Sequence, residues 1–267
     1  MKNIKMIVTD LDRTLLHKHN SETISDYTAG ILNKCRQNGI KVVFATARPK
    51  RVTLQFLEYV PADALIMHNG AVIYIGDEQI FHCGISHDTA KNIVKSISRD
   101  FPEATIGVES NEIYYMNFEA EYDESVNIWN YTIINNKLYE HLPDKLTEKI
   151  IIGLKSLSMT AENVFEYFPK YLSDDLYLEI DTKRFVMIMN RKAKKSLAVK
   201  FLAERYGYNI TEVIAFGDDF NDVEMLRECG VGIAVSNAID EAKAAADYIC
   251  DTNDNDGVAK WIEENVL

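Results

Sequence analysis

Short apolar runs alternate with amphipathic stretches in both terminal parts of the chain. An apolar run at 6–9 is followed by a segment with apolar residues at helical spacing, 25–39, and then by a second apolar run, 40–46. Ser25 is a suitable N-cap for the helix, and Gly39 is a suitable stop. The pattern therefore predicts a strand, a helix and a strand in succession.

The C-terminal part repeats this alternation. Its predicted elements are a helix at 195–207 closed by Gly207, a strand at 212–218, a helix at 221–229, a strand at 230–235, and a helix at 237–247 capped by Asn237. Strands that alternate with helices imply right-handed crossovers and a parallel sheet covered on both faces. We therefore expect an α/β fold with a Rossmann-like, doubly wound parallel sheet as its core.

The middle of the chain has a different pattern. Its predicted elements are a helix at 88–99, a strand pair at 105–110 and 113–117, a strand at 149–155, a helix at 160–168, and two further strands at 176–180 and 185–189. Short polar connections favour antiparallel hairpins. We expect an inserted α+β cap domain at 83–186, with the core formed by 1–82 and 187–267.

Charge and composition limit the class of function. The chain has 267 residues, with 29 Lys and Arg against 41 Asp and Glu, a net charge of −12. This excess of acidic residues argues against nucleic acid as a partner. A small anionic substrate is compatible with it if cations at the binding site offset the negative potential of the protein. The four cysteines are far apart, and neither a signal peptide nor an apolar span is evident. We expect a cytoplasmic protein that does not enter a membrane, of unknown oligomeric state.

Polar residues follow three of the predicted strands. Asp10 and Asp12 come after the first strand, Thr46 ends the second, and Asp218 follows the strand near the C-terminus. Ligands of open parallel sheets bind beyond the carboxyl ends of the strands, so these side chains should meet in one crevice. Three clustered carboxylates require a hard cation, and Mg²⁺ is the expected one because it prefers oxygen ligands and leaves positions for phosphate.

Other residues complete a possible phosphate site. Lys195 at a helix start, the Thr46 hydroxyl and the backbone of the segment 46–48 could bind phosphoryl oxygens. Lys192 and Lys194 are nearby, but the apolar register of the helix favours Lys195.

Four motifs in order resemble the haloacid dehalogenase-like phosphohydrolases. They are DLDRT at 10–14, ATAR at 45–48, Lys195 in KSLAVKFLAE, and GDDFND at 217–222. The large insertion, MHNGAVIY at 67–74 and the C-terminal segment ADYICDTNDNDGVAKWIEE are similar to the Cof-type subgroup, which carries an α/β cap. Four ordered motifs are far more specific than one.

The resemblance implies a role for each motif residue. Asp10 is implied as the nucleophile that forms an aspartyl-phosphate, and Asp12 as the general acid and base. Mg²⁺ would be bound by the Asp10 carboxylate, the Asp12 backbone carbonyl and Asp218. Asp222 and Asn221 would support the ion, with Asn221 also near the phosphate. Thr46, Lys195 and the backbone of Ala47 would bind the transferring phosphoryl group.

Three positions depart from the family pattern. Arg13, Ala47 and Ser196 stand where glycine is usual. Glycine permits backbone conformations that a Cβ disfavours, so the loop after Asp12 is expected either to adjust or to use Arg13 for binding. Arg48 is expected either near the site or in a structural ion pair.

The reaction class has alternatives. The leading prediction is a Mg²⁺-dependent phosphatase of a small phosphorylated metabolite: a sugar phosphate, a nucleotide or a phosphorylated vitamin. A phosphotransferase or mutase could use the same intermediate. A phospho-receiver domain or a phospho-ligand-binding protein would be non-enzymatic, but neither needs both Asp10 and Asp12 together with GDDFND.

Overall fold

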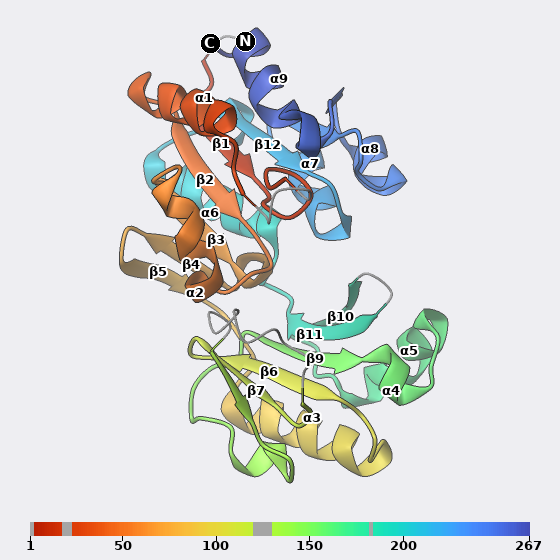
Figure 1. The fold of residues 1–267 in the computed structure, drawn as a ribbon. Coiled ribbons are helices and arrows are strands. Elements are labelled where there is room, and N and C mark those ends of the chain that lie inside the picture. Colours follow the sequence, from red (N-terminus) through yellow and green to blue (C-terminus); the bar gives the residue numbers. More distant parts are fainter. Residues whose placement is uncertain (1–2, 18–22, 120–129, 182–183) are drawn as a thin grey trace. The chain divides into compact units, whose positions relative to one another are not determined.

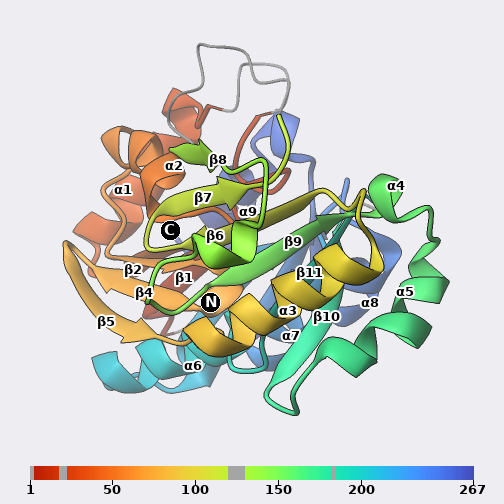
Figure 2. The ribbon, with the colours of Figure 1, turned by 90° about the horizontal axis from the view of Figure 1, so that it is seen from below.

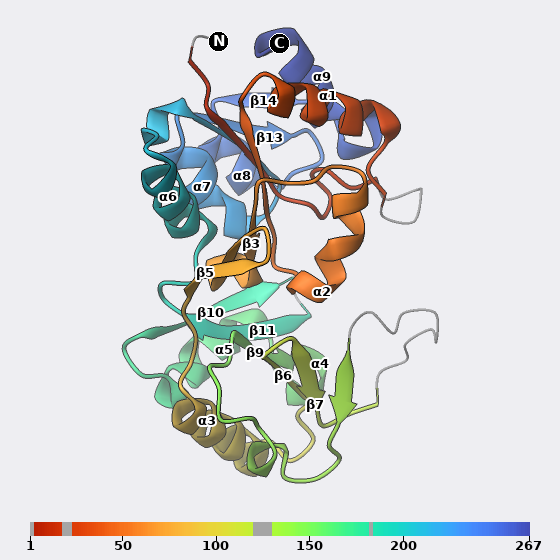
Figure 3. The ribbon, with the colours of Figure 1, turned by 90° about the vertical axis from the view of Figure 1, so that its left-hand side faces the viewer.

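Eight strands form the sheet of the first structural unit in this computed structural model, which describes residues 3–17, 23–119, 130–181 and 184–267. The strands are β1 (Met6–Thr9), β2 (Lys41–Ala45), β3 (Ala64–Met67), β4 (Val72–Ile75), β5 (Glu78–His82), β12 (Val213–Gly217), β13 (Val231–Val235) and β14 (Tyr248–Cys250). Their order is β14-β13-β12-β1-β2-β3-β4-β5. Figure 1 labels the strands from β12 to β5, and Figure 3 labels β13 and β14. The strands from β14 to β3 are parallel to one another, whereas β4 and β5 are antiparallel.

The central strands are buried because their sequences are almost entirely apolar. All four residues of β1 are fully buried, and so are the last four of β2. Strands that are covered on both faces lack the polar alternation of a half-exposed sheet. The predicted α/β core with a parallel sheet is therefore confirmed, with β4 and β5 as an antiparallel edge that the sequence analysis did not predict.

Helices cover both faces of this sheet. They are α1 (Asp26–Gln37), α2 (Lys50–Thr53), α6 (Lys195–Tyr206), α7 (Val223–Glu228), α8 (Asp240–Ala245) and α9 (Gly257–Asn265). Helix α1 packs with α9, and α6 packs with α7. Figure 3 shows the first pair on one side of the sheet and the second pair on the other. Among the described residues, no helix has both the length and the apolar composition needed to cross a bilayer.

Helix ends follow the capping rules in three of the four predicted cases, and one of these is Gly39, which follows the C-cap of α1 with a φ of 81°. The Ser25 side chain accepts a hydrogen bond from the backbone N–H of Thr28, and Gly207 ends α6 with a φ of 73°. The predicted cap at Asn237 is wrong, because α8 begins only at Asp240. Asn237 instead donates its side-chain N–H to the backbone oxygen of Arg13.

The second unit contains a six-stranded sheet. Its strands are β6 (Ile106–Ser110), β7 (Ile113–Met116), β8 (Tyr131–Ile133), β9 (Lys149–Gly153), β10 (Leu176–Asp181) and β11 (Phe185–Asn190), in the order β10-β11-β9-β6-β7-β8. Its helices are α3 (His87–Asp100), α4 (Leu154–Leu157) and α5 (Ala161–Tyr167). Apolar residues of α3 join those of the strands in one hydrophobic core. Figure 2 shows α3 lying over β9 and β11.

The second unit extends beyond the expected boundary. By their contacts, the units are Met1–His82 with Lys194–Leu267, and Cys83–Ala193. A boundary after residue 186 would cut through β11, which pairs along its length with β10 and also with β9. Backbone pairing therefore keeps the whole of β11 in the insertion, and the core resumes at α6.

Candidate active site

Three neighbouring strands end at one edge of the core sheet. Strand β1 pairs with β2 on one side and with β12 on the other, all in parallel. Asp10, Thr46 and Asp218 are the residues that immediately follow these strands. The topology therefore brings together side chains that are separated by up to about two hundred positions in the sequence, as the carboxyl ends of parallel strands do in general.

Three buried carboxylates gather at this edge. One oxygen atom from each of Asp10, Asp218 and Asp222 lies within 4.8 Å of the others. Asp222 comes from the short 3₁₀ turn Phe220–Asp222 that follows β12. Burial raises the pKa of Asp10 well above its usual value, with Lys195 opposing and the other acids adding to the shift. Without cations, these charges would destabilise one another.

Lys195 supplies one cation from the first residue of α6. Its Nζ lies 2.7 Å from Asp10 Oδ1 and 2.7 Å from Asp222 Oδ1, and the residue is only 1% exposed. Burial alone would lower the pKa of this amine, but the charges of Asp10 and Asp222 raise it above its ordinary value. Lys194 instead pairs with Glu224. The register argument for Lys195 thus selected the lysine that contacts the cluster.

Asp222 also orders the backbone of the motif loop. Its Oδ2 accepts hydrogen bonds from the N–H groups of Asp218, at 3.0 Å, and Asp219, at 3.2 Å. A Cβ at Gly217 would lie 2.5 Å from the Asp222 Cβ, so only glycine allows this close approach. Asp222 therefore links Lys195 to the loop that carries Asp218.

Asp218 has one oxygen suited to a metal. Its Oδ1 accepts a hydrogen bond of 2.9 Å from Thr14 Oγ1, whereas its buried Oδ2 has no hydrogen bond. Burial raises the pKa of Asp218 to about 7, and the charge of Asp222 adds to the shift while Arg13 opposes it. A cluster of buried carboxylate oxygens, one of them without a hydrogen bond, fits a hard divalent cation such as Mg²⁺.

Asp12 stands apart from this cluster and pairs with Arg48. The Arg48 guanidinium donates from Nε to Asp12 Oδ2 at 2.8 Å and from a terminal nitrogen to Oδ1. Arg48 is buried, while 45% of the Asp12 side chain is exposed. The guanidinium carbon also lies 5.5 Å from the centre of the Phe56 ring. Arg48 was expected either near the site or in a structural ion pair. It meets both expectations, because its ion-pair partner, Asp12, is one of the predicted site residues.

The remaining predicted residues lie on adjoining loops. Thr46 Oγ1 accepts a hydrogen bond of 3.1 Å from the backbone N–H of Arg48, and Ala47 lies between them. Asn221 donates its side-chain N–H to Asn69 Oδ1 at 3.0 Å. Asn69 was not predicted to contact a site residue; it belongs to an Asn-Gly pair, a sequence typical of turns, and it adopts a left-handed φ of 59°.

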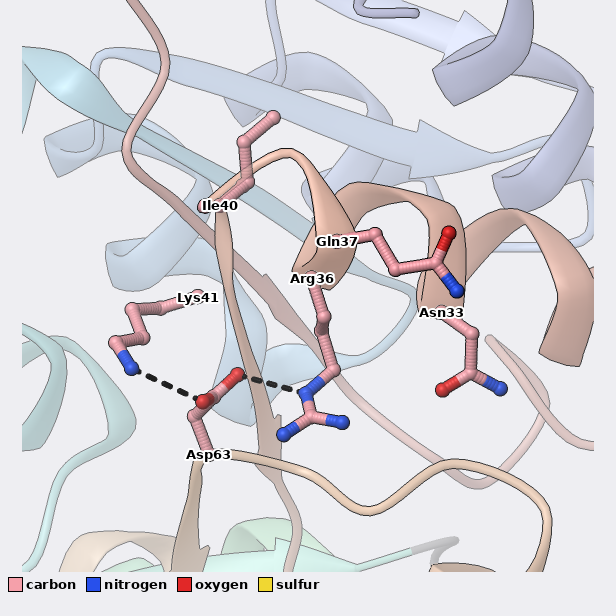
Figure 4. A pocket seen from close by; sticks show the side chains of 7 residues that line it. Asn33, Arg36, Gln37, Ile40, Lys41 and Asp63 are labelled. Carbon is pink, nitrogen blue, oxygen red and sulfur yellow. Dashed lines mark hydrogen bonds and ion pairs between the residues drawn. The ribbon is translucent and has the colours of Figure 1, made fainter.

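A pocket of about 460 Å³ lies elsewhere on the core unit (Figure 4). Its lining includes Arg36 and Lys41, which both bind the carboxylate of Asp63 at 3.0 Å and 3.1 Å. Lys41 begins β2 and Asp63 directly precedes β3, so this pocket lies at the amino ends of the parallel strands. It is therefore at the opposite edge of the sheet from the carboxylate cluster.

Comparison with known proteins relates the whole chain to phosphatases. A family model described as haloacid dehalogenase-like hydrolase matches residues 7–262. The 5-amino-6-(5-phospho-D-ribitylamino)uracil phosphatase YitU of Bacillus subtilis (strain 168) is 27% identical over 270 residues, which cover 97% of this chain and 96% of that protein. A phosphoglycolate phosphatase of Methanobrevibacter smithii is 26% identical over 266 residues, covering 99% and 100% of the two chains.

The fold is also similar to that of solved structures. The crystal structure of TM0651 from Thermotoga maritima aligns with a TM-score of 0.82 and 26% identity, over 99% of this chain and 98% of that one. The similarity thus includes both the core and the insertion.

Proposed function

Because the chain belongs to the haloacid dehalogenase-like hydrolases and is a phosphatase of the Cof type within them, we propose that it hydrolyses a small phosphorylated metabolite through a phosphoester on Asp10. The observation that carries this proposal is the position of Asp10, at the end of the central strand and 2.7 Å from the buried Lys195 amine. A carboxylate held in this way is oriented as a nucleophile, and the lysine offsets the charge that would repel phosphate.

Mg²⁺ is the cofactor that we propose for this site. The Asp10 carboxylate, the Asp12 backbone carbonyl and Asp218 would hold it, with Asp222 and Asn221 in support. The buried Oδ2 of Asp218, which has no hydrogen bond, supports this assignment. When bound, the ion would neutralise phosphate charge so that an anionic nucleophile can approach.

The first chemical step transfers the phosphoryl group to the protein. An oxygen of Asp10 attacks phosphorus and forms the aspartyl-phosphate, while the bond from phosphorus to the leaving oxygen breaks. Asp12 gives its proton to that oxygen, so the alcohol leaves as a neutral molecule. The exposed part of the Asp12 side chain, 45%, is consistent with contact between this carboxyl group and a bound substrate.

The second step regenerates the protein. Asp12, now a carboxylate, takes a proton from water as the water oxygen attacks phosphorus. The bond from phosphorus to the Asp10 oxygen breaks, and inorganic phosphate leaves with Asp10 free and Asp12 protonated. Thr46, Lys195 and the backbone of Ala47 would bind the phosphoryl oxygens in both steps. The loop from Thr46 to Arg48, which directly follows β2, supports this role.

The substrate class is a small phosphorylated metabolite. Two relatives with nearly equal identity, 27% and 26%, are named for different phosphate esters, so neither name identifies the substrate of this chain. The decisive experiment is phosphate release from a panel of sugar phosphates, nucleotides and phosphorylated vitamins, with wild type and Asp10→Asn side by side. Release by wild type alone supports the proposal, whereas equal release by both proteins contradicts it.

A further inference from the structure

Arg13 is held over the carboxylate cluster by its loop. Its backbone has a φ of 60°, in the left-handed region that favours glycine. The backbone oxygen accepts a hydrogen bond of 2.8 Å from Asn237 Nδ2, and the guanidinium donates one of 3.0 Å to the backbone oxygen of Asn237. These two bonds tie the side chain and the backbone of Arg13 to the same residue.

The other terminal nitrogen of this guanidinium, Nη1, faces Asp218. This nitrogen lies 3.4 Å from Asp218 Oδ2, the buried oxygen that has no hydrogen bond. The Arg13 side chain is 49% exposed, whereas that of Asp218 is 3% exposed. Lys195 reaches Asp10 and Asp222 from inside the core, so Asp218 receives its nearest positive charge from Arg13 on the solvent side.

We propose that Arg13 is a tethered cation that competes with the divalent metal for Asp218 and thereby sets the metal affinity of the site. The inference rests on the metal site of the proposed function. An ion bound to Asp218 Oδ2 would share that oxygen with a guanidinium of like charge, and the two would repel each other. Because half of the Arg13 side chain already faces water, it can turn outward at a modest cost.

The proposal makes metal affinity depend on the charge of Arg13. Removing this charge should tighten Mg²⁺ binding by roughly two- to fivefold, which is the size of effect expected for a partly exposed ion pair. Arg13→Gln removes the charge and keeps most of the length. Arg13→Gly removes the charge, and glycine adopts the backbone φ of 60° without strain, so we expect this variant to fold.

Isothermal titration calorimetry with MgCl₂ tests this inference on the full chain. The matched control is Lys260→Gln, which removes one positive charge from an exposed side chain of α9 whose ion-pair partner is Asp251. We expect tighter binding for both Arg13 variants and wild-type binding for the control. Equal or weaker binding by the Arg13 variants would overturn the inference, and so would equal tightening in the control.

Thermal unfolding gives a readout independent of binding heats. Without added metal, Arg13→Gln should melt below wild type, because Asp218 loses its nearest solvent-side cation. Its gain in Tm on addition of Mg²⁺ should exceed that of wild type. An equal or smaller gain would count against the inference. If wild type bound no Mg²⁺, both the proposed metal site and this inference would be wrong. If wild type bound Mg²⁺ and the Arg13 variants bound it with the same affinity, only this inference would be wrong.

Discussion

Lys195 Nζ and Asp10 Oδ1 lie 2.7 Å apart in the core, although 185 positions separate the two residues in the sequence. The contact joins the start of α6 to the end of β1, and the same amine reaches Asp222. One buried cation thus connects three of the four motifs that predicted the active site.

Removing this cation should destabilise the fold as well as the activity. In Lys195→Ala, two buried carboxylates lose their partner, and breaking a buried pair in this way costs about 3–5 kcal/mol. We expect that loss in the free energy of unfolding, measured by urea denaturation at neutral pH without metal. Lys194→Ala is the control, because its pair with Glu224 is partly exposed and worth at most about 1 kcal/mol. Similar losses in the two variants would show that Lys195 has no special role.

Arg48 should act through Asp12. Its forked pair fixes the carboxylate that we propose as acid and base, so Arg48→Gln should lower kcat by about 10- to 100-fold with a smaller effect on KM. Arg48→Lys keeps the charge but loses the fork and should recover only part of the rate. Steady-state kinetics measure both constants.

A suitable control is Arg99→Gln, since the Arg99 side chain is 73% exposed and pairs with Asp100 on the insertion. If Arg48→Gln raised KM alone, Arg48 would bind substrate instead of positioning Asp12.

Asp63 should make stability depend on pH without affecting the reaction. Burial would raise the pKa of Asp63, but hydrogen bonds from the Val42 N–H, Arg36 and Lys41 hold it below its usual value. The folded state therefore favours the carboxylate. Its contribution to stability is complete above the unfolded pKa of about 4 and is lost as pH falls through the lower folded pKa.

Asp63→Asn should consequently unfold more easily than wild type at pH 7, and the difference should shrink below about pH 4. Urea denaturation across this range measures it. Because Asp63 lies at the opposite edge of the sheet, kcat should remain within about twofold of wild type. A difference that grew on acidification would reverse the sign derived from the ion pairs.

Metal removal should abolish turnover reversibly. We expect a chelator to stop phosphate release and Mg²⁺ to restore it, because in the proposed mechanism a divalent cation offsets the charge of the carboxylate cluster so that an anionic substrate can approach. Ca²⁺ is larger and prefers more ligands, so it should support a much lower rate. Full activity in the presence of the chelator would rule out the proposed cofactor.

Sequence reasoning identified β1, β2, β12 and β13 and the site residues that follow the first three of these strands, because both depend on local patterns, whereas β3, β4, β5 and β14 were not predicted. Strands β1, β2 and β12 are continuous apolar runs, and parallel strands necessarily bring Asp10, Thr46 and Asp218 to one edge. The full length of the insertion was harder to predict. A strand at 185–189 was predicted among the elements of the insertion, but only the pairing of β11 with β9 and β10 shows that the insertion continues past residue 186 to include the whole of that strand.

Other features depend on contacts that no local pattern encodes. Asn237 looked like a helix cap, but its side chain bonds to Arg13, which is 224 positions away. Asn221 and Asn69 are likewise joined by a hydrogen bond although 152 positions separate them in the sequence. Tertiary structure decides which of several possible partners a polar side chain takes, and for that reason Asn237 was misassigned and Asn69 was missed.

The most direct test of the account is to trap the phosphorylated protein. Asp12→Asn should be incubated with a ³²P-labelled substrate found in the panel, quenched in acid and digested, with Asp10→Asn and the double variant as controls. We expect label on the peptide that contains residue 10, released by hydroxylamine as an acyl phosphate is, and no label in either control. Label on another residue, or equal label in Asp10→Asn, would contradict Asp10 as the nucleophile.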